Sequence, residues 1–156
     1  MITNSFLKMT KINDPMEKTD SAVLLIENTP IGPLLLTAGE RGIAKMCFCN
    51  LEDFSNLLSG QKIIIKKEGY EILQEAARQL DAYFSGARKR FDLPIDFSSE
   101  SAFTKRVLNA VMKIPFGNVM SYGAVAEVIT HPRSARAVGG ALARNPIPVI
   151  IPCLHR

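Results

Sequence analysis

The sequence has few cysteines and histidines, and this scarcity excludes several kinds of protein. Its 156 residues contain three cysteines, two of them at Cys47 and Cys49, and only two histidines. Cysteines at this spacing do not make a disulfide framework, and no second cysteine or histidine pair follows at the spacing of a zinc site. We therefore expect a chain without a metal site, in a reducing, cytoplasmic setting.

Long apolar segments and nucleotide-binding loops are missing too. No apolar run approaches the roughly 18 residues that a membrane span needs, and no N-terminal stretch has the character of a signal peptide. The glycines do not form a phosphate-binding loop. With 47% hydrophobic residues, the composition is typical of one or two soluble domains with substantial cores, and we expect no membrane partner.

Positive charge is concentrated in the last third of the chain. Residues 1–97 contain 12 lysines and arginines against 13 aspartates and glutamates, whereas residues 98–156 contain 7 against 2. The net charges are therefore −1 and +5. A compact basic segment suits a polyanion, with nucleic acid as the first candidate. On charge alone, a merely solvated basic face is an equally good interpretation.

The first part of the chain predicts a small α+β domain behind a flexible leader. Residues 1–20 are polar and aperiodic, as is typical of a leader. Short turns then separate three β-prone runs, which favours an antiparallel sheet; the runs are Ala22–Glu27, Pro33–Ala38 and Ile43–Cys49. Apolar residues at helical spacing from Tyr70 to Phe84 predict a helix that covers this sheet.

The remainder of that domain is less regular. Residues 50–60 have the pattern of a loop or short helix, and Ile63–Ile65 that of a further short strand. Apolar and polar residues alternate over residues 91–97, which predicts an edge strand that tolerates its proline. We expect the domain to span residues 21–97.

Residues 98–156 predict a mostly helical domain. Capping residues at 98–101 precede a helix with apolar positions up to Met112. Ser121 can cap a second helix, Tyr122–Ile129, and Ser134 a third, Ala135–Arg144. The four-residue turn between these two helices gives the outline of a helix-turn-helix.

The third predicted helix has a surface with few long side chains. Arg136 and Arg144 are its only long ones, and its centre holds the adjacent glycines Gly139 and Gly140. Each glycine lowers helix stability by roughly 1 kcal/mol relative to alanine. We therefore expect another group to pack closely against the helix backbone at these positions, which would offset the loss. Two partners remain open, a neighbouring helix or the backbone or groove of a nucleic acid.

The last dozen residues lead to a cysteine beside two basic residues. Prolines 146, 148 and 152 each fix their own φ and bias the preceding residue to extended geometry, so we predict a stiff extended segment that ends at Cys153. His155 and Arg156 follow, and a positive neighbour lowers a thiol pKa and raises the fraction of reactive thiolate. A buried structural cysteine is the alternative.

Five motifs in this order resemble those of the O6-alkylguanine-DNA alkyltransferases. They are Ile114-Pro115-Phe116-Gly117, Ser121-Tyr122-Gly123, Arg136-Ala137-Val138-Gly139, Asn145-Pro146 and Ile151-Pro152-Cys153. The resemblance is dense over residues 101–153 and looser over 21–97. It implies an α+β protein with an N-terminal ribonuclease-H-like domain, in which a helix covers a small antiparallel sheet. A mostly helical, winged-helix-like domain with the helix-turn-helix would follow.

The resemblance also implies an activity. Proteins of this family repair double-stranded DNA by moving the alkyl group of O6-methylguanine, and by expectation of O4-methylthymine, onto their own cysteine in one irreversible turnover. Cys153 would be the acceptor here. We expect no cofactor and a monomeric protein.

The family's functional residues can be placed on this chain motif by motif. Arg136 would enter the base stack in place of the flipped nucleotide, and Tyr122 would crowd the 3′ phosphate. Base extrusion costs a few kcal/mol, and a planar cation that fills the gap offsets part of it. The further expected DNA-binding residues are Ser134, Ala137 and Gly139, and the residues expected to shape the site are Asn145 and Pro152.

The last residues depart from the family's pattern. Leu154 stands between Cys153 and His155, so His155 is a displaced candidate for the histidine that relays the thiol proton. The family's following loop and glutamate are not in this sequence, and the C-terminal domain is therefore expected to be truncated. Three interpretations stay open: a working methyltransferase, a non-catalytic module that binds alkyl lesions, and an inactive truncated member of the family.

Overall fold

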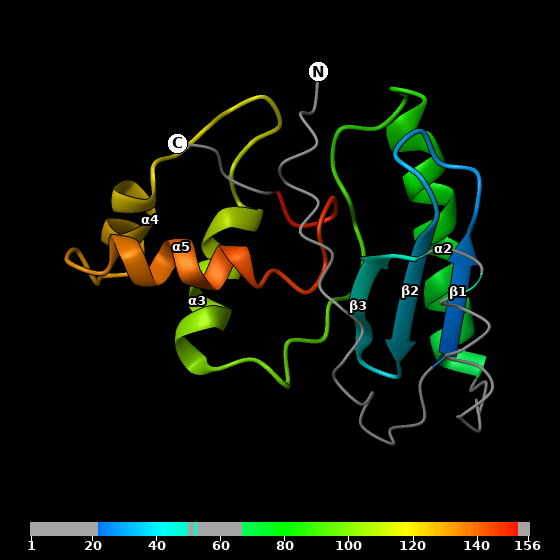
Figure 1. Cartoon of the computed structure of the whole chain (residues 1–156), viewed down its shortest axis with the longest axis horizontal. Helices are drawn as coiled ribbons and strands as arrows, with labels where there is room; N and C mark the ends of the chain where they lie inside the picture. Colours follow the sequence, from blue (N-terminus) through cyan, green and yellow to red (C-terminus); the bar gives the residue numbers. More distant parts are fainter. Residues whose placement is uncertain (1–21, 50–51, 53–66, 153–156) are drawn as a thin grey trace.

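The computed structural model describes residues 22–49, residue 52 and residues 67–152. The predicted leader, the predicted strand Ile63–Ile65 and the residues from Cys153 to Arg156 lie outside this part of the chain. Figure 1 shows two halves, a sheet with a covering helix and a group of helices. The chain ahead of Cys153, in red, runs between them.

The N-terminal half is built on a three-stranded antiparallel meander, as the sequence predicts. Its strands are β1 (Ala22–Ile26), β2 (Leu34–Gly39) and β3 (Gly42–Phe48), in the order β1-β2-β3. The register pairs Leu24 with Leu36 and Leu36 with Met46. Five of the six residues of the central strand are buried, so β2 supplies much of the core of this half.

Helix α2 (Lys67–Phe84) packs against all three strands. Its buried face is formed by Leu73, Ala76 and Leu80, which recur at helical spacing as predicted. The helix begins three residues before the predicted start at Tyr70, which is 48% exposed and contributes little to the apolar face.

The predicted edge strand over residues 91–97 is wrong. Among the described residues, this segment makes one isolated parallel bridge, between Ile95 and Ile43. The Ile43 N–H donates to the Pro94 carbonyl at 2.8 Å, and the Asp96 N–H donates to the Ile43 carbonyl at 2.9 Å. Pro94 has no N–H to donate, which limits a ladder here, and the approach is so close that a Cβ on Gly42 would lie 2.4 Å from the Pro94 carbonyl oxygen.

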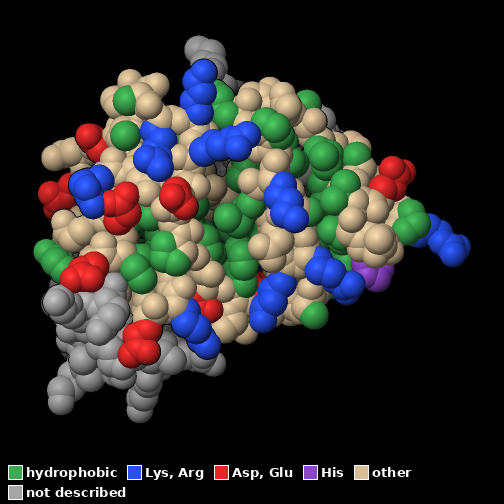
Figure 2. Space-filling view, turned by 180° about the vertical axis from the view of Figure 1, so that it is seen from behind, with side chains coloured by type: hydrophobic (Ala, Val, Ile, Leu, Met, Phe, Trp, Pro, Cys, Tyr) green, Lys and Arg blue, Asp and Glu red, His purple; other side chains and the backbone are tan. Residues whose placement is uncertain are grey.

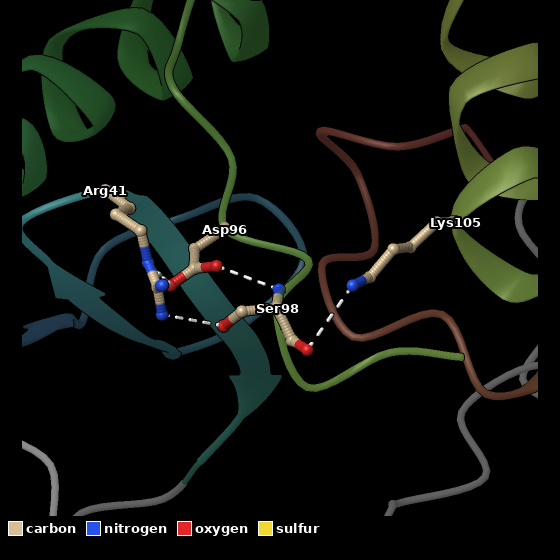
Figure 3. Close-up of polar contacts among 4 residues, drawn as sticks. All are labelled: Arg41, Asp96, Ser98 and Lys105. Atoms are coloured by element: carbon tan, nitrogen blue, oxygen red, sulfur yellow. Dashed lines mark hydrogen bonds and ion pairs between the residues drawn. The ribbon is translucent and has the colours of Figure 1, made fainter. Parts of the chain in front are cut away.

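A polar cluster joins the β2–β3 turn to the chain that enters the second half (Figure 3). The Arg41 Nε lies 3.1 Å from Asp96 Oδ2, and its Nη2 donates to Ser98 Oγ at 2.9 Å. Lys105 Nζ donates to the Ser98 carbonyl at 3.4 Å. Burial raises the pKa of Asp96, but hydrogen bonds from Ser98 and Arg41 outweigh it and hold that pKa below its ordinary value.

The second half consists of α3 (Ala102–Met112), α4 (Tyr122–Val128) and α5 (Ala135–Ala143). Each of these helices packs against the other two. Serine capping is confirmed for two of them, since Ser101 accepts from the Thr104 N–H and Ser121 from the Ala124 N–H. Among the described residues, no helix combines the length and apolar character that crossing a membrane requires.

Candidate DNA interface and alkyl-acceptor segment

Helix α5 has one buried and one exposed side. Val138, Ala141 and Leu142 are buried against α3 and α4. Arg136 and Ala137 lie on the exposed side, near the start of the helix. A helix surface with a methyl group beside a long cation can come close to a groove that larger side chains would obstruct.

Tyr122 is the first residue of α4, and its half-buried ring lies on the backbone of α5. A Cβ on Gly139 would be 3.1 Å from Cε2 and 3.2 Å from Cδ2 of this ring. The close approach at Gly139 is therefore made within the protein. Gly140 differs, because its nearest neighbour is a guanidinium nitrogen of Arg144, at an ordinary contact distance of 3.8 Å.

The predicted side-chain cap at Ser134 is wrong. Ser134 precedes α5, but its hydroxyl accepts no backbone N–H of that helix. It donates instead to the His131 carbonyl at 2.6 Å, and the Ser134 N–H bonds to the same oxygen at 3.0 Å. The tight turn thus uses both Ser134 donors, and the residue's φ of −105° and ψ of 22° lie outside the extended geometry of a serine cap.

The segment after α5 is not the continuous extended strand that its prolines suggested. Val149 adopts a φ of +73°, and the Ile151 N–H donates to the Ile147 carbonyl at 3.0 Å, which closes a turn. A proline fixes φ only at its own position and biases the residue before it, so it does not prevent a turn at the residue that follows. Ile147 and Ile151 are fully buried by this folding back.

Asn145 stabilises this turn with both polar atoms of its side-chain amide. Its Nδ2 donates to the Ile151 carbonyl and its Oδ1 accepts from the Ile147 N–H, both at 3.0 Å. The neighbouring Pro146 carbonyl accepts from the Met46 N–H at 2.8 Å, which attaches the segment to β3. The turn is thereby tied to both halves of the protein and ends at the exposed Pro152.

The predicted acceptor Cys153 lies outside the described residues, and so do Leu154, His155 and Arg156. The other two cysteines are in β3 or directly after it. Burial raises the pKa of the Cys47 thiol, and Lys45 opposes this shift only in part. Cys49 is buried. Neither position offers the exposed thiolate that attack on carbon requires.

A cleft that sequence reasoning did not predict lies beside the end of this segment. It has a volume of about 620 Å³ and lies between α2, the segment after it and the α3–α4 loop. Pro152 lines it, together with Tyr83 and Phe116, whose ring centroids are 6.3 Å apart. The Lys89 Nζ lies 6.0 Å from the Phe116 ring centroid. The motif around Phe116 did not predict this cleft, because the opposite wall includes Tyr83 of α2, which is distant in the sequence.

The distribution of charge on the surface follows the difference between the two parts of the sequence. In Figure 2, most acidic side chains lie on the left, over the half that contains the sheet. Basic side chains are spread over the centre and right of the same face. Within the described residues, no group of three or more histidines, cysteines, aspartates and glutamates could hold a metal ion.

Two family models match the chain. The 6-O-methylguanine DNA methyltransferase DNA-binding domain matches residues 102–156, and the ribonuclease-like domain of the same proteins matches residues 24–97. The chain belongs to the 6-O-methylguanine DNA methyltransferase family. Membership assigns it to DNA repair by direct alkyl transfer, with DNA as its partner.

Relatives of the methyltransferase family match over most of their length. The methylated-DNA–protein-cysteine methyltransferase of Methanosarcina acetivorans is 39% identical over 135 residues, which are 84% of this chain and 80% of that protein. The protein of the same name from Mycobacterium leprae is 39% identical over 129 residues, which are 83% of this chain and 73% of that protein. Mycobacterium tuberculosis OGT in complex with DNA superposes with a TM-score of 0.65 at 35% identity, covering 83% of this chain and 73% of that one.

Proposed function

We propose that this chain repairs double-stranded DNA by moving the alkyl group of O6-methylguanine onto Cys153. The thiolate sulfur attacks the methyl carbon, a carbon–sulfur bond forms, and the bond between that carbon and O6 breaks. The electron pair stays on the guanine, which takes up one proton in place of the one that the thiol lost. No external cofactor enters this balance, and the sulfur is consumed in a single turnover.

The hydrogen-bonded turn at Asn145 is the observation that best supports this proposal. It joins the end of α5 to Pro152, the residue directly before Cys153, and its two bonds of 3.0 Å restrict the path of the chain there. A rigid link between a DNA-binding helix and a nucleophile is useful because alkyl transfer needs an attack in line with the breaking bond. Asn145 and Pro152 are therefore proposed as residues that shape the site.

The exposed side of α5 is the proposed DNA contact. Arg136 is exposed, as a side chain that replaces an extruded base must be. Ala137 and Ser134 are proposed to approach the sugar-phosphate backbone around it. Tyr122 is proposed to crowd a phosphate and favour extrusion of the damaged nucleotide, and His155, displaced by Leu154, is the candidate for the proton relay.

Further features of the expected protein are also proposals. We propose a division into domains at residues 21–97 and 98–156, action as a monomer, a cytoplasmic location, and O4-methylthymine as a second substrate. The basic C-terminal part supports the assignment of the DNA contact to residues 98–156.

The decisive experiment measures the intact mass of the protein before and after incubation with a duplex that carries one O6-methylguanine, followed by peptide mapping. A gain of one methylene group on Cys153 is the expected result. Folded protein with no gain would contradict alkyl transfer, and its preference for the lesion duplex would then separate a binding module from an inactive member of the family.

Two serine variants serve as controls. Cys153→Ser should abolish the mass gain and preserve DNA binding, whereas Cys47→Ser should gain mass as the parent does, because burial keeps the Cys47 thiol protonated. Methylation that persists in Cys153→Ser would place the acceptor at another cysteine.

A further inference from the structure

The contact between Gly139 and the Tyr122 ring is unusually close. The ring edge of Tyr122 faces the α5 backbone so closely that an added Cβ would lie 3.1 Å from Cε2 and 3.2 Å from Cδ2. Nine in ten real Cβ contacts are longer than this. The glycine thus allows a ring position that an alanine would displace by a few tenths of an ångström.

We propose that Gly139 is a positioning residue for lesion recognition, which acts by setting the place of the Tyr122 ring rather than by touching DNA. This inference rests on the proposed function, in which Tyr122 favours extrusion of the damaged nucleotide. It changes the role expected for Gly139 from a DNA contact to an internal support of the tyrosine.

The surroundings of Tyr122 show how α4 and α5 both contribute to its position. Its backbone is held at the start of α4, where Ser121 accepts from the Ala124 N–H at 3.1 Å. The side chain is only half-buried. The start of α4 therefore fixes the Tyr122 backbone, and the α5 backbone at Gly139 limits the position of one edge of the ring. A ring that moves away from α5 also moves relative to Arg136, three residues before Gly139 on the same helix.

Gly140 provides a matched control. Within the part of the chain that the structure describes, a Cβ there would meet an Arg144 guanidinium nitrogen at 3.8 Å, which is an ordinary contact. Gly139→Ala and Gly140→Ala therefore raise helix propensity equally at adjacent positions of α5. They differ in the contact with the Tyr122 ring.

The first measurement compares affinities for a duplex with one O6-methylguanine and for the unmodified duplex, all in the Cys153→Ser background so that no transfer intervenes. Because the Tyr122 ring must shift by a few tenths of an ångström, Gly139→Ala should lose part of the parental lesion preference. Gly140→Ala should keep the parental preference. Adding Gly139→Ala to Tyr122→Ala should cause no further loss.

The second measurement restores Cys153 and compares transfer from the lesion duplex with transfer from free O6-benzylguanine, a base that needs no extrusion from a helix. Gly139→Ala should slow only the duplex reaction. Equal lesion preference in the two alanine variants, equal slowing with the free base, or a full additional loss in the Tyr122→Ala background would each overturn the inference.

These readouts separate the inference from the function on which it rests. A parent that selects the lesion but transfers nothing contradicts the proposed chemistry alone, because the binding comparison still tests Gly139. A parent that transfers the methyl group but has no lesion preference keeps the proposed chemistry and contradicts the recognition role given to Gly139.

Discussion

Replacing Asn145 by alanine should destabilise the protein more than its small change in volume suggests. The substitution removes two hydrogen bonds of 3.0 Å, one to the Ile151 carbonyl and one from the Ile147 N–H. A net hydrogen bond is worth about 1 kcal/mol, and a buried donor left without a partner costs a further 1–3 kcal/mol. Ile147 is fully buried, so the free energy of unfolding should fall by roughly 3–5 kcal/mol.

Urea and thermal denaturation measure this loss, which corresponds to a fall in Tm on the order of 10 °C for a protein of this size. Transfer to Cys153 should slow as well under conditions where the variant is folded, because the turn that precedes the cysteine is no longer held. The rate should be measured with the lesion duplex at a temperature well below the Tm of the variant.

Asn109→Ala is the matched control for this experiment. Asn109 is exposed in α3, and its Nδ2 donates to the Lys105 carbonyl at 2.8 Å. Its loss should change stability by no more than about 0.5 kcal/mol, since water replaces the bond and alanine favours the helix. If Asn145→Ala is no less stable than Asn109→Ala, the turn is held by the packing of Ile147 and Ile151, and the reasoning from hydrogen bonds is wrong.

Three further predictions concern stability. Leu108→Ala should cost about 2–5 kcal/mol in urea denaturation, because the fully buried Leu108 leaves a cavity among the helices of the second half; a loss under 1 kcal/mol would contradict this. Ser121→Ala should cost about 1 kcal/mol and Ser134→Ala less, since only Ser121 caps its helix; equal losses would argue against this distinction. The pKa of Asp96 is lower in the folded than in the unfolded state, so the native protein binds fewer protons than the unfolded chain. The Asp96 carboxylate therefore contributes to the free energy of unfolding at pH values above its unfolded pKa. This contribution is lost as pH falls through the folded pKa, below about pH 4. Urea denaturation at a series of pH values measures the loss. If Asp96→Asn shows the same acid dependence as the parent, the assignment to Asp96 is wrong.

The sequence alone was sufficient to predict the main elements of the fold. Turn residues between short β-prone runs predicted the meander, and helical periodicity predicted α2 and its buried face at Leu73, Ala76 and Leu80. Ser121 was correctly identified as a cap because capping depends on a few residues adjacent in the chain. The order of five motifs was enough to indicate the family.

Local patterns were misleading where a distant partner competes with them. The alternation over residues 91–97 predicted a strand, but the approach of Gly42 to Pro94 leaves room for a single bridge. Prolines predicted an extended path before Cys153, whereas the Asn145 side chain draws Ile151 back into a turn. Neither partner can be recognised from spacing, since the first is about fifty residues away and the second requires a side chain to reach across a turn.

The amino-acid sequence by itself determined the main elements, their order and the basic C-terminal part. Only the tertiary structure decided what the bare surface of α5 contacts. It placed Tyr122 on Gly139 and left Gly140 with an ordinary contact, although the two glycines are equivalent in the sequence. The physical reason is that a helix presents adjacent residues about 100° apart, so the packing of α4 on α5 gives each glycine a different neighbour.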